Sequence, residues 1–155
     1  VLLNPKKMIR IPPPIEITCR YGPIFFSTAV ARHMIERGKG GRIINISSQV
    51  GVVGGPGRAV YTGAKGGVCN LTKSLAAEWA EHGITVNAIG PTMTRTPLAE
   101  KAMENPSFKA QVSKILMGRL AEPEEIAGGV LFLSSEAGTM VTGHTLLIDG
   151  GYTVV

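Results

Sequence analysis

The spacing of apolar residues along this chain changes several times, from a helical period to short runs of branched or large apolar residues. The helical period predicts helices over residues 23–38, over residues 59–82 and from Pro123 onward. The short runs predict strands at residues 42–47, 84–89 and 144–149. Because helix and strand alternate, the pattern predicts an α/β fold whose parallel sheet has three or four strands and flanking helices.

Proline and glycine mark the boundaries of these elements. Pro23 is suited to the first turn of the helix that we expect over residues 23–38. The glycine-rich run at residues 51–57 predicts a tight loop after the first strand. Pro97 and Pro106 are helix breakers, so we expect the segment between residues 94 and 117 to be a loop that carries function.

The composition is that of a single folded domain. With 155 residues, of which 44% are hydrophobic, the chain is large enough to form a core. Its apolar stretches are much shorter than the roughly 20 residues of a membrane helix, and no signal-peptide pattern is recognisable, so we expect a cytoplasmic location and no membrane partner. Cys19 and Cys69 lack a C-x-x-C spacing, which predicts reduced thiols and no metal site.

The chain is basic, with a formal net charge of +5. Lys6, Lys7 and Arg10 lie close together near the start, but the other cations are scattered, and aromatic residues make up only 5% of the chain. Nucleic-acid interfaces usually gather cations on one face and interleave aromatic residues. We therefore expect no nucleic-acid partner, and an anionic cofactor, or the loss of an acidic first half, accounts for the charge more simply.

Candidate chemistry lies between residues 48 and 65. Tyr61 and Lys65 are four residues apart, so on a helix their side chains share one face. An ammonium group beside a phenol favours the ionised phenolate, which can act as a general acid and base. Ser48, at the end of the preceding strand, could donate a hydrogen bond to a substrate oxygen. A Tyr and Lys at this spacing are also a common surface pair, so the interpretation depends on their surroundings.

Those surroundings resemble the short-chain dehydrogenase/reductase family from about Gly22 to Gly151. Four blocks carry the resemblance in order: "GRIINISS", which ends at Ser48, the Tyr-x-x-x-Lys signature "YTGAK", "GITVNAIGP" and "VTGHTLLIDGG". The resemblance implies a Rossmann-like sheet with Tyr61 as the catalytic acid and base. It implies that Lys65 promotes the ionisation of Tyr61 and holds the nicotinamide ribose, while Ser48 orients the carbonyl.

The resemblance also implies an NAD- or NADP-dependent oxidoreductase that interconverts a secondary alcohol and a ketone, of the sugar/polyol or 3-oxoacyl-thioester type. The residues expected to bind the cofactor are Tyr61, Lys65, Pro91, Thr92, Thr94 and Thr96. No metal is implied. The partners expected are a small alcohol or ketone substrate and a second copy of the chain, bound through the helices at 23–38 and 59–82.

The pattern of the family is incomplete in this sequence. No glycine-rich turn of the G-x-G-x-x-G kind is present, although such a turn normally binds the pyrophosphate of a dinucleotide. We therefore expect a truncated chain that lacks the first half of the fold and binds its cofactor weakly. Residues 1–14 are expected to be an atypical segment, and residues 15–155 the C-terminal part of a dinucleotide-binding domain. The alternative is a non-catalytic oligomerisation module or an inactive fragment of such an enzyme.

Two positions near the expected site depart from the family. Cys19 occupies the position of an asparagine that completes the catalytic tetrad, and a thiol cannot replace the paired donors and acceptors of an amide. Thr92 occupies the position of a glycine that lets the backbone approach the nicotinamide. Asn87, inside the strand at 84–89, is expected to form a structural hydrogen bond rather than to act in catalysis.

Overall fold

The computed structural model describes residues 15–154, with side chains from residue 22 onward. The expected segment 1–14 lies outside the described residues. The larger helices and the strands, in chain order, are α1 (Ile15–Arg37), β1 (Gly41–Ile46), α2 (Ala59–Trp79), β2 (Ile84–Pro91), α3 (Pro97–Ala102), α4 (Pro106–Val112), α5 (Pro123–Ser134) and β3 (Thr145–Ile148). Short 3-10 turns lie at Gln49–Gly51, Ala80–His82 and Glu136–Gly138.

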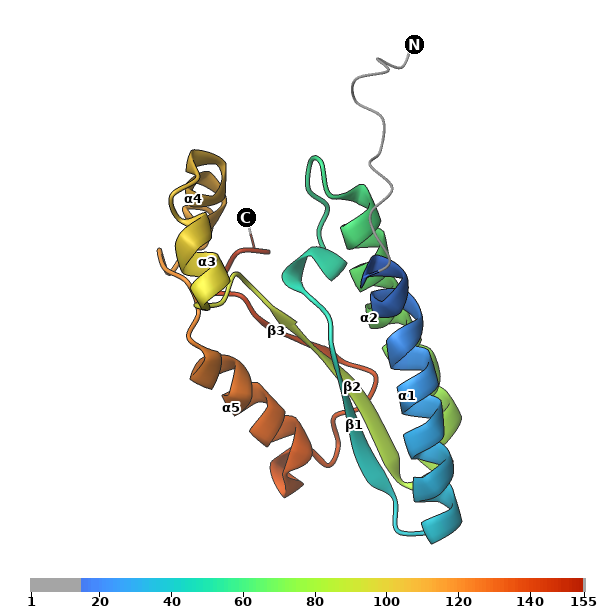
Figure 1. Ribbon diagram of the computed structural model, residues 1–155. Helices are drawn as coiled ribbons and strands as arrows, with labels where there is room; N and C mark the ends of the chain where they lie inside the picture. The colour runs from blue at the N-terminus through green and yellow to red at the C-terminus, as the bar shows by residue number, and fades with distance from the viewer. Residues whose placement is uncertain (1–14, 155) are drawn as a thin grey trace.

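The strands form one parallel sheet in the order β1-β2-β3. Ile43 pairs with Val86 in the register of β1 and β2, and Ala88 pairs with Thr145 in that of β2 and β3. Parallel neighbours need crossover connections, which α2 and α5 provide. Helices α1 and α2 cover one face of the sheet and α5 covers the other (Figure 1). The expected α/β class is confirmed.

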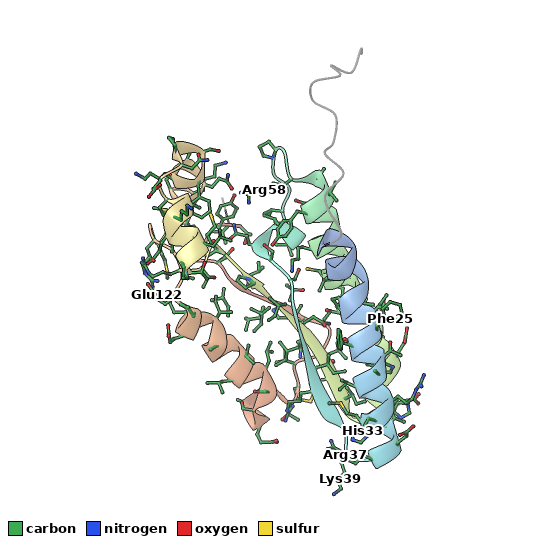
Figure 2. All side chains as sticks on the ribbon, in the orientation of Figure 1. Phe25, His33, Arg37, Lys39, Arg58 and Glu122 are labelled. Carbon is green, nitrogen blue, oxygen red and sulfur yellow. The ribbon has the colours of Figure 1, made fainter. Side chains whose placement is uncertain are left out.

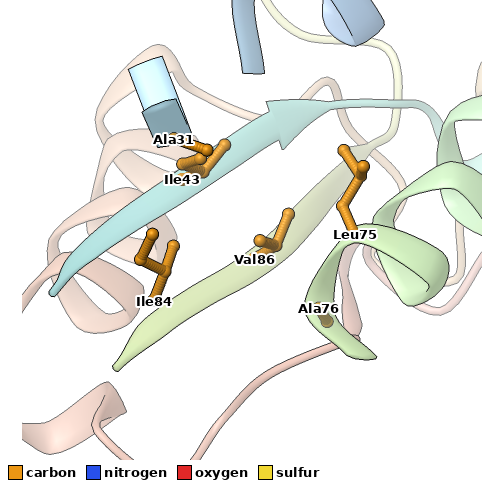
Figure 3. Packing of buried hydrophobic residues seen from close by; sticks show 6 residues of the cluster. All are labelled: Ala31, Ile43, Leu75, Ala76, Ile84 and Val86. Atoms are coloured by element: carbon orange, nitrogen blue, oxygen red, sulfur yellow. The ribbon is translucent and has the colours of Figure 1, made fainter. Parts of the chain in front are cut away.

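The main core lies between the sheet and the pair formed by α1 and α2. Its buried members are Ala31, Ile43, Leu75, Ala76, Ile84 and Val86 (Figure 3). Strand β2 is central and covered on both faces, and Val86, Ala88 and Ile89 have no exposed surface. A strand buried on both faces is expected to be apolar along most of its length, as "ITVNAI" is.

Helix α1 corrects one expectation. We expected it to begin at Pro23, but it begins at Ile15, and Pro23 lies inside it. Proline lacks an N–H, so the helix loses one main-chain hydrogen bond at that residue, but the turns before it can still form. The other end was predicted within one residue, because Gly38 follows Arg37 with φ of +66° and donates its N–H to the carbonyl of Met34.

The segment from residue 94 to residue 117 is a second correction. It contains α3 and α4, where a loop was expected. Each helix has its proline in the first turn, where a missing N–H costs nothing. Thr96 Oγ1 accepts a hydrogen bond from Ala99 N at 3.1 Å, and Asn105 caps α4 in the same way. The two prolines therefore begin helices.

Helix α5 provides a direct test of packing on the other face of the sheet. Leu133 has no exposed surface, whereas Leu131 on the same helix is 69% exposed. Leu133→Ala is expected to lower the free energy of unfolding by about 2–3 kcal/mol, the low end for this substitution, because α5 can shift toward the sheet and partly close the cavity. Urea denaturation measures the change. Leu131→Ala is the control, and an equal loss in both variants would contradict the prediction.

The start of α5 makes stability depend on pH. The Arg119 guanidinium binds both carboxylate oxygens of Glu125, at 2.7 and 2.8 Å, and the main-chain N–H of Glu122 also donates to Glu125. These hydrogen bonds lower the pKa of Glu125 from 4.5 to about 2.

Because the folded pKa of Glu125 lies below the unfolded value, its stabilising contribution is present above pH 4.5 and is lost as the pH falls toward 2. Glu125→Gln and Arg119→Gln should therefore each lower the melting temperature at neutral pH. Near pH 2, the melting temperature of each variant should lie closer to that of the unmodified chain. Thermal melts from pH 7 to pH 2 test this. The prediction is refuted if the melting temperature of Glu125→Gln lies as far below that of the unmodified chain at pH 2 as it does at pH 7.

Candidate active site

The expected acid/base residues come from the end of β1 and the first turns of α2. Ser48 follows β1 in extended conformation and accepts a hydrogen bond from Val50 N. Tyr61 and Lys65 lie one turn apart on α2, and the Lys65 ammonium is 5.9 Å from the centre of the Tyr61 ring, within cation–π range. Lys65 Nζ also donates to the main-chain carbonyl of Ile46 at 3.0 Å. Lys65 thus contacts both Tyr61 and the strand that carries Ser48.

Ser47 and Gly51 support this arrangement, although neither residue stands out in the sequence as part of the site. Ser47 is buried, and its Oγ donates to the main-chain carbonyl of Lys65 at 2.8 Å and lies 3.2 Å from Cys69 Sγ. A Cβ added to Gly51 would lie 2.8–2.9 Å from Ser47 Oγ, Cys69 Sγ and the Lys65 carbonyl oxygen. Position 51 therefore requires glycine because α2 and the end of β1 approach closely there.

A buried polar chain adds a second link between the same elements. Ser27 Oγ of α1 donates to Asn45 Oδ1 at 3.4 Å, and Asn45 Nδ2 donates to Thr72 Oγ1 of α2 at 3.2 Å. All three residues are buried. Hydrogen bonds in a buried network are costly to break. The hydrogen bonds among Ser27, Asn45 and Thr72 therefore fix the position of α2, and with it Tyr61, relative to β1.

The residues expected at the cofactor lie at the carboxyl end of β2, next to Ser48. A Cβ on Gly90 would lie 3.3 Å from the carbonyl of Ser48, so the two strand ends are in close contact. Pro91 ends β2, and Thr94 Oγ1 donates to the Thr92 carbonyl at 3.1 Å. Thr96 is exposed and caps α3.

Thr92 is the residue of this group that best fits a bound cofactor. Its side-chain oxygen is buried and has no hydrogen-bond partner among residues 22–154. An unpaired buried hydroxyl costs free energy, so this end of β2 can accept one more hydrogen-bonding group than the protein itself supplies. The nicotinamide side of a dinucleotide fits that description, and the partly exposed Tyr61 lies on α2, which packs against β2. Cys19 lies in α1, but its side chain is outside the described residues.

Three further features describe the rest of the structure. Residues 15–154 contain no helix that is both long and apolar enough to cross a membrane. No group of three potential metal ligands gathers within that range. A hollow of about 550 Å³ lies at the amino ends of the strands, where Arg42 pairs with Glu136 at 3.1 Å. That hollow is at the opposite end of the sheet from Tyr61.

The parallel sheet, its two layers of helices and the polar residues at the carboxyl ends of the strands define an α/β domain of the Rossmann type. Residues 15–153 match a family model described as enoyl-(acyl carrier protein) reductase. The chain belongs to the short-chain dehydrogenase/reductase family.

Three known proteins illustrate the relationship. The chain is 37% identical to D-threitol dehydrogenase of Mycolicibacterium smegmatis over 99% of its own length and 63% of that protein. It is 42% identical to the 3-oxoacyl-(acyl-carrier-protein) reductase of Vibrio harveyi, over 86% of this chain and 54% of the relative. A structure of 4-hydroxyisoleucine dehydrogenase complexed with NADH superimposes with a TM-score of 0.85 at 30% identity, over 91% of this chain and 58% of that one. The chain thus spans between half and two thirds of the length of these relatives.

Proposed function

We propose that this chain provides the acid/base and nicotinamide-binding part of an NAD(P)-dependent oxidoreductase that interconverts a secondary alcohol and a ketone. The observation that carries the proposal is the position of Lys65, whose ammonium contacts Tyr61 and the end of the Ser48 strand together. The relationship to polyol dehydrogenases and 3-oxoacyl reductases supports it.

Each residue of the candidate site has a separate role in the proposed reaction. A nicotinamide cofactor bound at the ends of β1 and β2 would supply the hydride acceptor for oxidation of the alcohol and the hydride donor for reduction of the ketone. Tyr61 takes the hydroxyl proton as phenolate in oxidation, and as phenol it donates a proton to the carbonyl oxygen in reduction. Lys65 stabilises the phenolate, and Ser48 holds the substrate oxygen. Thr92, Thr94 and Pro91 at the end of β2 would hold the nicotinamide. Thr96, which caps α3, would contact it from the edge of the site.

Cofactor binding is the most direct test. NADH and NADPH are titrated into the purified chain while nicotinamide fluorescence is followed, and turnover is then measured with a sugar, a polyol and a 3-oxoacyl thioester. Saturable binding and turnover of at least one substrate support the proposal. If neither cofactor binds at millimolar concentration, the chain is not an oxidoreductase on its own.

A second candidate function is association without catalysis, and the outer face of α1 favours it. Phe25, which is labelled in Figure 2, and Phe26 are 68% and 75% exposed, and Ile24 and Val30 of the same helix are 38% and 44% exposed. An exposed apolar patch of this kind usually marks an interaction surface. We propose that a second copy of the chain covers this face through α1 and α2. Light scattering, which measures the mass of the particle in solution, tests this association. The unmodified chain should be a dimer, and a double Phe25→Ser, Phe26→Ser variant should be monomeric. An unmodified chain that is already monomeric would refute the association.

A further inference from the structure

Arg58 has no role in the acid/base chemistry proposed for its neighbour Tyr61. It is the residue immediately before α2, and Tyr61 lies in the first turn of that helix. Its guanidinium donates a hydrogen bond to Gln111 Oε1 of α4. Arg58 therefore lies between the start of α2 and α4, at the carboxyl ends of the strands (Figure 2).

The positive charge of Arg58 is not balanced by a nearby acid. Gln111 is neutral, and the ion pairs found among residues 22–154 do not include Arg58. The other arginines at this end of the sheet differ, because Arg95 pairs with Glu122 at 2.9 Å and Arg119 pairs with Glu125 at 2.7 Å. Neither α4 nor the first four turns of α2 contain an acidic residue.

The geometry of a guanidinium suits it to an anionic group of the substrate. It presents five N–H donors in a rigid fork that matches the oxygens of a carboxylate or phosphate, and Gln111 occupies one of them. Arg58 is also partly buried, so water screens its charge less than that of an exposed residue.

We propose that Arg58 binds a carboxylate or phosphate of the substrate, so that the site prefers a hydroxy acid or phosphorylated alcohol to a neutral one. This inference rests on the proposed function, since it gives the substrate class of the same site. Arg58 holds the anionic group while Tyr61, three residues away on α2, exchanges the proton with the reacting oxygen.

Arg58 could instead be only a structural link between α2 and α4, and substitutions at Gln111 separate the two roles. Gln111→Glu keeps the link but adds a carboxylate that neutralises Arg58. Gln111→Ala removes the link but leaves the charge. If Arg58 binds an anion, Gln111→Glu and Arg58→Gln should both weaken anion binding, whereas Gln111→Ala should not. If Arg58 is only a link, Gln111→Glu should have no effect.

The experiment compares D-gluconate with sorbitol, which differ at one carbon in having a carboxylate or a hydroxymethyl group. Binding of each to the cofactor-free chain is measured by saturation-transfer NMR and by calorimetry, with inorganic phosphate as a second anionic probe. We expect gluconate to bind more tightly than sorbitol, and Arg58→Gln and Gln111→Glu to weaken gluconate binding about tenfold to a hundredfold, the effect of one charge-assisted hydrogen bond.

Several outcomes would overturn the inference. They are equal binding of gluconate and sorbitol, no binding of gluconate or phosphate, and unchanged gluconate binding in Gln111→Glu. Circular dichroism of each variant separates a lost ligand contact from a lost fold. Because these measurements need no cofactor, anion binding that depends on Arg58 in a chain that fails to bind NADH would sink the proposed function and leave the anion site in place.

Discussion

Replacing Tyr61 by phenylalanine is expected to lower the turnover of an alcohol substrate by at least about 100-fold, the usual effect of removing a general acid and base. The substitution deletes one oxygen and keeps the ring that faces the Lys65 ammonium. Tyr61 is 38% exposed, and its side-chain oxygen makes no hydrogen bond to residues 22–154, so the fold should not change. Steady-state kinetics with NAD or NADP, together with a melting temperature for each variant, provide the measurement.

Tyr152→Phe is the matched control for this substitution. Tyr152 packs against the buried cluster of Val112, Ile115 and Leu120 and is not one of the proposed acid/base or cofactor residues, so Tyr152→Phe should lose no activity. A Tyr61→Phe variant that retains more than about a tenth of the turnover would show that another group moves the proton. If the unmodified chain itself has no turnover, the proposed function fails before Tyr61 is tested.

The elements that could be predicted from the sequence are those with a complete hydrophobic period. Helix α2 begins at Ala59 as expected, and the chain continues in a 3-10 turn to His82 before Gly83, whose φ is +68°. Strand β2 was found because burial on both faces makes its sequence almost wholly apolar. In both cases the environment that stabilises the element also determines its local pattern.

Helices α3 and α4 could not be predicted in the same way. With six and seven residues they are too short to display a helical period, and their prolines were interpreted as breakers. The usable signal was the residue before each proline, because Thr96 and Asn105 are both good N-caps. A capping residue followed by proline is thus better evidence in this chain than the proline alone.

The candidate site was predicted in part. The Tyr-x-x-x-Lys spacing identified Tyr61 and Lys65 correctly as neighbours on one face of a helix, since that relationship is local. The contacts of Lys65 with Ile46 and Ser47 depend on how α2 packs against β1, about 18 residues earlier in the chain. Arg58 and Gln111 are 53 residues apart, and neither belongs to a recognisable motif. Such contacts become visible only in the folded chain.

The connection from α5 to β3 depends on one buried amide, which gives the largest effect on stability that we expect. Asn87 is 1% exposed and lies inside β2, as a structural hydrogen-bonder should. Its Nδ2 donates to the Val141 carbonyl at 2.7 Å, and its Oδ1 accepts from His144 N at 3.1 Å. Asn87→Ala leaves both main-chain groups without this partner and opens a small cavity. We expect it to lower the free energy of unfolding by about 3–5 kcal/mol.

Urea denaturation followed by the fluorescence of Trp79, the one tryptophan in the sequence, measures this loss because Trp79 packs against the main core. Asn70→Ala on the exposed face of α2 is the matched control and should change stability by no more than about 0.5 kcal/mol. A small effect of Asn87→Ala would mean that water replaces both hydrogen bonds. A loss of the expected size would show that the Asn87 side chain holds the connection that leads into β3.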